Sequence, residues 1–188
     1  MQRRQFLFTL SHGVGGLSAL AALSHSGNAY AITPTNQDQV SIMRFSNNGQ
    51  ALGRVTLPKV KKKEAEWKQQ LSPLAYQVTR QQGTERAFSQ PGYDRHEAGL
   101  YRCVCCDNAL FNADAKYDSG TGWPSFWQPI AAENVRNISD HLFGMARTEV
   151  QCTLCDAHLG HVFEDGPKPT GLRYCMNTVA LRFIPRTK

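Results

Sequence analysis

The sequence predicts a mainly β protein, mostly antiparallel, that is preceded by short helices. Helical periodicity ends at Gly83, and the residues after it form short alternating runs, such as 150–153 and 179–184, that are typical of half-buried strands. The chain also contains 15 glycines and 9 prolines, which interrupt these runs as turns do. With 188 residues, of which 41% are hydrophobic, it is long enough for one ordinary core and an appendage.

The first 31 residues have the pattern of an export signal. Arg3 and Arg4 precede two apolar runs, no acidic residue is present, and Ala29-Tyr30-Ala31 fits the cleavage rule for secretory signals. Residues 2–7 (QRRQFL) resemble the twin-arginine signal. The alternatives are a frayed basic end and a membrane anchor, but the apolar runs are short for an anchor. We therefore predict a signal peptide over residues 1–31, a periplasmic location, and no stable membrane insertion after its removal.

The charge of the chain excludes one class of partner. Its formal net charge is +6, and the predicted mature chain keeps 19 basic residues against 15 acidic ones, a surplus of +4. This surplus is too small to indicate a nucleic-acid partner.

Residues 32–63 are predicted to form a hairpin and a linker. Two β-prone runs, 40–45 and 51–57, flank the segment Ser-Asn-Asn-Gly at 46–49, and Asn-Gly is a strong hairpin signal. Four lysines follow within residues 59–63, and we expect them to be a solvated linker.

The third segment, residues 64–188, is predicted to begin with two helices. Residues 64–71 have a helical pattern. Ser72 then has the character of an N-cap, Pro73 suits the first helical position, and Gly83 is expected to end the second helix.

Two stretches in this segment repeat each other. Residues 101–110 (YRCVCCDNAL) align with 150–159 (VQCTLCDAHL), so that Cys, Cys, Asp and Leu fall at identical offsets. Two Cys-x-x-Cys turns supply four thiolates for a tetrahedral structural zinc site. Cys105 aligns with Leu154 and is therefore the extra cysteine. The predicted ligands of one zinc ion per chain are Cys103, Cys106, Cys152 and Cys155.

Two other uses of these cysteines are open from the sequence. In an oxidising compartment the four could form two disulfides. His158 and His161 could instead bind zinc with Cys152 and Cys155, but the first pair of cysteines would then have no purpose. We favour the four-cysteine site.

Cys175 stands apart from this set. Arg173 and Asn177 flank it at a spacing of two, which places all three side chains on one face of a strand. A cation and an amide donor beside a thiol favour its thiolate, which is the reactive form. The alternative is a small buried core residue.

Histidines and aromatic residues supply further candidates. His158 and His161 follow the second knuckle and have no counterpart in the first, so we expect them to donate protons near a reactive centre. Residues 118–127 form a glycine-rich loop with three aromatic side chains, which suits the wall of an apolar pocket or a plug of the core.

The ordered set of motifs resembles the type B methionine sulfoxide reductases, which reduce the R epimer of methionine sulfoxide. The resemblance spans about residues 64–185. Its motifs are GTERAF at 83–88, SGTGWPSF at 119–126, FGM at 143–145, HLGHVF at 158–163, DGP at 165–167 and TGLRYCMN at 170–177. It implies two antiparallel sheets with short N-terminal helices, held together by a four-cysteine zinc site.

The same resemblance implies roles for single residues. Cys175 would attack the sulfoxide sulfur and become a sulfenic acid. His158, His161 and Asn177 would hold and protonate the sulfoxide oxygen, and Arg173 would favour the thiolate. In the glycine-rich loop, Trp123 and Phe126 would bind the substrate, with Trp123 against its methyl group.

One position departs from the family pattern. Thr121 occupies the place where many members have a resolving cysteine. We therefore expect a thioredoxin-like protein or another external thiol to reduce the sulfenic acid, with Cys105 as the alternative resolving residue. The substrate would be an oxidised protein or peptide, and the role would be repair of exported proteins. The competing functions are a zinc-stabilised binding module without catalysis and a thiol peroxidase.

Overall fold

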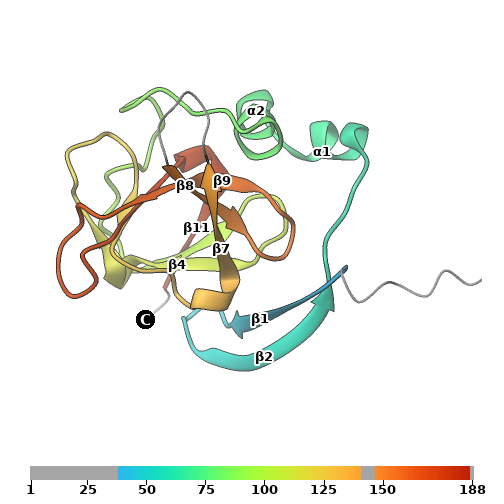
Figure 1. Ribbon diagram of the computed structural model, residues 1–188, viewed down its shortest axis with the longest axis horizontal. Helices are drawn as coiled ribbons and strands as arrows, with labels where there is room; N and C mark the ends of the chain where they lie inside the picture. Colours follow the sequence, from blue (N-terminus) through green and yellow to red (C-terminus); the bar gives the residue numbers. More distant parts are fainter. Residues whose placement is uncertain (1–37, 141–146, 187–188) are drawn as a thin grey trace, which may run out of the picture. The chain divides into compact units, whose positions relative to one another are not determined.

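The computed structural model describes residues 38–140 and 147–186, and it consists mainly of antiparallel strands (Figure 1). The predicted signal at 1–31 and the motif at 143–145 lie outside these residues. Neither of the two described α-helices has the length and apolarity that a membrane crossing requires.

The strands form three antiparallel sheets, where the family resemblance implies two. A two-stranded sheet pairs β1 (Gln39–Phe45) with β2 (Ala51–Pro58). The three-stranded sheet has the order β11-β3-β4 and the six-stranded sheet the order β5-β6-β10-β9-β8-β7. Their strands are β3 (Gly99–Cys103), β4 (Ala109–Asn112), β5 (Lys116–Tyr117), β6 (Ser125–Phe126), β7 (Val135–Asp140), β8 (Arg147–Cys152), β9 (His158–Phe163), β10 (Arg173–Met176) and β11 (Leu181–Pro185).

Two helices precede the main sheets. They are α1 (Glu64–Gln70) and α2 (Pro73–Gln81), with Trp67 of α1 and Val78 of α2 buried in the core. The Ser72 hydroxyl caps α2 by accepting a hydrogen bond from the backbone N–H of Ala75 at 3.2 Å, as expected for an N-cap. The left-handed residue that ends the helix is Gln82, with φ 55°, rather than the predicted Gly83.

Short 3₁₀ turns connect several strands. They are η2 (Ala113–Ala115), η3 (Ala132–Asn134) and η5 (Thr178–Ala180). The predicted run at 179–184 therefore begins as a turn and becomes a strand only at β11, because the backbone bends immediately after β10.

Aromatic side chains join the two larger sheets. Phe126 of β6 stacks on Phe111 of β4 with ring centroids 4.4 Å apart, and Tyr101 of β3 meets the same ring edge-on at 5.0 Å. All three are buried, so their packing removes apolar surface of both sheets from water and stabilises the core.

The β1–β2 hairpin lies on the side of the sheets away from the helices (Figure 1). The buried side-chain amide of Asn134 in η3 binds the β1 backbone at both polar groups of Met43, each at 2.8 Å. The sequence predicts that the lysines after the hairpin are solvated, and this is wrong for Lys59. The side chain of Lys59 is only 14% exposed, because its ammonium group pairs with Asp156 of the second knuckle.

Candidate metal centre and candidate active site

The two knuckles adopt the same backbone geometry. Asp107 and Asp156, at equivalent places in the repeat, both have positive φ, 64° and 55°. Each donates its backbone N–H to the carbonyl oxygen of the first cysteine of its knuckle, at 2.9 Å in both cases. The sequence repeat is therefore also a structural repeat, and each turn directs two thiols to the same side.

The four knuckle cysteines form one cluster. Their sulfur atoms all lie within 4.8 Å of one another. The Cys103–Cys155 and Cys106–Cys152 sulfur pairs are 3.7 and 3.6 Å apart. A tetrahedral ion with metal–sulfur bonds of about 2.3 Å places its ligands about 3.8 Å apart, so this spacing suits a metal ion. The four cysteines could hold one, whereas His158 belongs to a different group of contacts.

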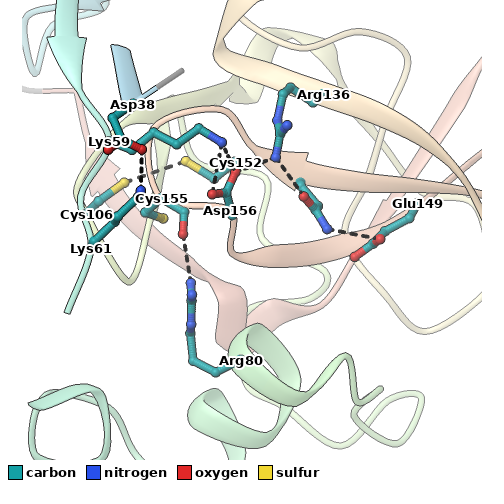
Figure 2. Close-up of polar contacts among 11 residues, drawn as sticks. Asp38, Lys59, Lys61, Arg80, Cys106, Arg136, Glu149, Cys152, Cys155 and Asp156 are labelled. Carbon is teal, nitrogen blue, oxygen red and sulfur yellow. Dashed lines mark hydrogen bonds and ion pairs between the residues drawn. The ribbon is translucent and has the colours of Figure 1, made fainter. Parts of the chain in front are cut away.

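Two segments fix the second knuckle from outside (Figure 2). The Lys59 ammonium group donates to both carboxylate oxygens of Asp156, at 2.7 and 3.0 Å. Next to it, the backbone N–H of Val60 donates to the carbonyl oxygen of Leu154 at 2.8 Å. From α2, Arg80 donates to the carbonyl oxygen of Cys155 at 2.8 Å. The segment that follows the hairpin thus supports the cysteine cluster directly.

Cys175 lies at the edge of a separate hollow of about 150 Å³. It is half-buried in β10, between His161 of β9 and Ser125 of β6 in the antiparallel register. Paired residues of neighbouring strands place their side chains on the same face, so the three side chains form one row. The hollow is lined by Thr84, Trp123, Gly160, His161, Phe163, Cys175, Met176 and Asn177.

The surroundings of Cys175 act on its thiol in opposite directions. Burial raises the pKa of the Cys175 thiol above its ordinary value, and this effect outweighs the lowering by the Thr121 hydroxyl, the Arg173 charge and the Ser125 hydroxyl. The Thr121 oxygen is 3.9 Å from the sulfur. The lowering by Arg173 has the direction that the sequence predicts, but desolvation of the thiol is the larger effect here.

Arg173 shares the half-buried face of β10 with Cys175, as the spacing predicts, but its guanidinium group is occupied elsewhere. It donates two hydrogen bonds, each of 2.8 Å, to the carboxylate of Asp165. It also lies over the ring of Phe163, 4.3 Å from the centroid. Asp165 thus fixes the position of Arg173, and from this position the guanidinium group lowers the pKa of the Cys175 thiol by its charge and by hydrogen bonding.

A β-bulge brings the two histidines together. His161 lies opposite Glu149 of β8, whereas the pairing of Gln151 with His158 leaves Leu159 as an extra residue in β9. Without the bulge, an offset of three would place the two histidines on opposite faces of the strand. Their rings instead meet at 5.4 Å between centroids. Only His161 lines the hollow, and His158, 3% exposed, lies behind it.

Asn177 lies just past the end of β10 and is tied to the chain on both sides of its amide. Its Oδ1 accepts a hydrogen bond from the backbone N–H of Glu85 at 3.0 Å, and its Nδ2 donates to the carbonyl oxygen of Leu159 at 3.1 Å. One N–H of this amide remains for a ligand in the hollow, since the group carries two donors.

Glu85, which the sequence did not single out, organises this region. Its buried carboxylate accepts the backbone N–H groups of Thr178 and Val179 at 2.7 and 3.0 Å. Its carbonyl oxygen accepts the indole N–H of Trp123 at 3.2 Å. It thereby fixes both Asn177 and Trp123, and its place in the motif at 83–88 is the only signal that the sequence offers.

The aromatic loop divides between the hollow and the core. Trp123 is half-buried and lines the hollow, as expected. Phe126 does not reach it, because its fully buried ring stacks on Phe111. The expectation that Phe126 binds substrate is corrected accordingly, since the strand β6 turns this side chain to the face opposite Ser125.

Comparison with known proteins agrees with this geometry. The family model of the SelR domain matches residues 71–185. The peptide methionine sulfoxide reductase MsrB of Hahella chejuensis is 56% identical over 127 residues, which are 68% of this chain and 91% of the relative. The enzymes of the same name from Thioalkalivibrio sulfidiphilus and Pseudomonas aeruginosa are 51% and 52% identical, over 74% and 69% of this chain and 96% and 98% of their own lengths. The β1–β2 hairpin precedes the residues that the SelR model matches.

Proposed function

Because the chain belongs to the SelR-domain family of peptide methionine sulfoxide reductases (MsrB), we propose that it reduces methionine-R-sulfoxide in peptides and proteins to methionine. The observation that carries this proposal within the structure is the hollow in which Cys175 meets a histidine and an indole. A sulfoxide needs a nucleophile for its sulfur, a proton for its oxygen and an apolar surface for its methyl group, and these three side chains supply them.

The reaction transfers the oxygen from substrate to enzyme. The Cys175 sulfur attacks the sulfoxide sulfur, the S–O bond of the substrate breaks, and an S–O bond to Cys175 forms. The substrate sulfur is reduced by two electrons and the cysteine sulfur is oxidised by two. The thiol proton leaves Sγ and one proton arrives at the oxygen, so the products are methionine and a cysteine sulfenic acid with no net uptake of protons.

His161 is the group suited to move this proton. It is the cross-strand neighbour of Cys175 and lines the same hollow. Burial raises the pKa of Cys175, which favours the thiol over the thiolate, so a neighbouring imidazole that accepts this proton assists the attack. The remaining N–H of Asn177 would hold the oxygen while negative charge develops on it.

The choice between epimers follows from fixed surroundings. Trp123 is held by its indole N–H on the carbonyl oxygen of Glu85 at 3.2 Å, so its ring has a defined position in the hollow. When the methyl group lies against Trp123 and the oxygen points toward His161 and Asn177, only one configuration at sulfur leaves the side that the nucleophile attacks open to Cys175.

An external thiol regenerates the enzyme. Two thiols reduce the sulfenic acid to the thiol, forming a disulfide between themselves and releasing water. Thr121 cannot resolve the sulfenic acid, although its oxygen is 3.9 Å from Cys175 Sγ. Cys105 is 4% exposed within the first knuckle, so a thioredoxin-like partner or a small thiol is the better reductant.

The metal is zinc, held by Cys103, Cys106, Cys152 and Cys155, one ion per chain. The all-sulfur donor set with sulfur pairs 3.6 to 3.7 Å apart supports this assignment. When bound, the ion supplies a rigid link between two distant turns and takes no part in the chemistry at Cys175.

The site of action is the periplasm, and the role is repair of oxidised exported proteins. The basis for this part of the proposal is the sequence of residues 1–31, with paired arginines, apolar runs and a small-residue cleavage site.

The deciding experiment compares resolved R and S epimers of a blocked methionine sulfoxide as substrates, with dithiothreitol as reductant and Cys175→Ser as control. We expect turnover of the R epimer alone, abolished in the variant. Turnover of neither epimer by folded, zinc-loaded protein would favour the binding module. Faster consumption of hydrogen peroxide than of sulfoxide would favour the peroxidase.

A further inference from the structure

One buried carboxylate has no role in the scheme above. Glu149 of β8 is 6% exposed, and its Oε1 lies 2.6 Å from Nδ1 of His158. It is also the register partner of His161, so Glu149, His161 and Cys175 form a row across β8, β9 and β10. A carboxylate in such a place costs free energy unless hydrogen bonds or an opposite charge compensate for the lost water.

We propose that Glu149 is a positioning residue that keeps a proton on Nδ1 of His158, so that Nε2 of His158 exchanges the reaction's proton with His161. This inference rests on the proposed function. An ionised carboxylate only accepts hydrogen bonds, so Nδ1 of His158 is the donor in the 2.6 Å contact. Nε2 is then the nitrogen that gains and loses a proton, and Glu149 stabilises the charge that appears on the ring.

The position of Nε2 agrees with this role. It is buried and has no hydrogen-bond partner among the described residues. The β-bulge at Leu159 places the His158 ring against the His161 ring at 5.4 Å between centroids. A buried imidazole with one nitrogen anchored and the other unpartnered, directly behind the histidine of the hollow, is suited to proton exchange rather than to packing alone.

The second oxygen of the carboxylate is also held (Figure 2). Oε2 of Glu149 accepts a hydrogen bond from Nε2 of Gln151 at 3.1 Å, and Arg136 donates to the Oε1 of Gln151 at 2.9 Å. Arg136 in turn pairs with Asp156 of the second knuckle. Both carboxylate oxygens therefore have fixed partners, and the chain of contacts continues to the metal knuckle.

A polar hollow gives His158 a route to solvent. This hollow, of about 210 Å³, is lined by His158 together with Thr79, Arg80, Gln81, Gln82, Gln151 and Asp156. It has room for water and polar groups to bind it. His158 thus lies between this polar hollow and His161, and it can hold the proton between its departure from the thiol and its arrival at the oxygen.

Two measurements test the inference. The first is the ¹⁵N spectrum of His158 in the wild-type protein, which reports the nitrogen that carries the proton in the neutral ring. We expect the Nδ1–H form. The Nε2–H form would overturn the proposal, whatever rates of sulfoxide reduction are measured. The tautomer can be determined even if the protein reduces neither epimer, so failure of this inference is distinguishable from failure of the proposed function.

The second measurement is the rate of R-sulfoxide reduction by Glu149→Gln, which keeps the shape and removes the charge. Acid–base assistance contributes about 10²–10⁴-fold to a rate, so we expect kcat to fall at least about tenfold while KM stays within about twofold. Glu133→Gln is the matched control, since this carboxylate pairs with Arg54 away from the hollow. Should Glu149→Gln not fold, Glu149→Asp replaces it; this variant keeps the charge but withdraws the carboxylate from Nδ1 of His158, and the same fall in kcat is expected. A kcat within twofold of wild type, or a loss confined to KM, would overturn the proposal.

Discussion

Replacing Glu85 by Gln tests whether this residue organises the site. The carboxylate accepts two backbone N–H groups at 2.7 and 3.0 Å in a place that is 3% exposed. Hydrogen bonds to a buried charge contribute about 1.5–3 kcal/mol each, and a neutral one about 1 kcal/mol. Gln keeps one acceptor and turns its NH₂ group toward the other N–H. We therefore expect the free energy of unfolding to fall by about 3 kcal/mol.

The assay is urea unfolding followed by tryptophan fluorescence, with thermal unfolding alongside. For a domain of this size, the expected loss corresponds to a fall of about 6–12 °C in the midpoint temperature. The exposed pair of Glu133 with Arg54 supplies the control, because Glu133→Gln should cost less than about 1 kcal/mol. A loss below about 1 kcal/mol for Glu85→Gln would refute the reasoning, since the two N–H groups would then have found other partners.

Three further outcomes are expected. Burial raises the pKa of Cys175, so less thiolate is present at a given pH, and alkylation of Cys175 by iodoacetamide should reach half its maximal rate at a higher pH than alkylation of free cysteine. In Arg173→Gln this midpoint should lie at a still higher pH, because the variant loses a cation that lowers the pKa of Cys175. Equal midpoints in the two proteins would contradict this. Lys59→Met loses the ion pair with Asp156, which is worth about 1 kcal/mol, so this variant should transfer its metal to a chelator about fivefold faster than the control Lys61→Met. Identical rates would exclude a supporting role for Lys59. Thr121→Cys should form a disulfide with Cys175 after one equivalent of substrate, since the present side-chain oxygen is 3.9 Å from that sulfur; two free thiols at these positions would show that the loop cannot close.

Local signals in the sequence were sufficient for several elements. The hairpin at β1 and β2 and the start of α2 follow from short-range chemistry, an Asn-Gly turn and a Ser-Pro cap. The cysteine cluster followed from the internal repeat, because identical turns at 103–106 and 152–155 present their thiols in the same way. The same alignment set Cys105 aside as the extra cysteine of the first knuckle and left Cys175 as the one cysteine away from both knuckles.

Other features depended on contacts between distant segments. Sequence alternation describes a regular strand, and it cannot locate a bulge, so only the structure shows that His158 stands behind His161. Phe126 belongs to the same aromatic loop as Trp123, yet the sheet turns it into the core.

The tertiary structure also decided which charges matter. Glu85 and Glu149 have no pattern around them that marks a site, and each is recognised only from a partner at least nine residues away in the chain. The raised pKa of Cys175 likewise comes from burial, although its nearest charged neighbour in the sequence, Arg173, acts in the opposite direction. The sequence alone thus determined the residue types and turns from which the two sites are made. Burial and cross-strand register, which arise only when the sheets assemble, decided how those residues act.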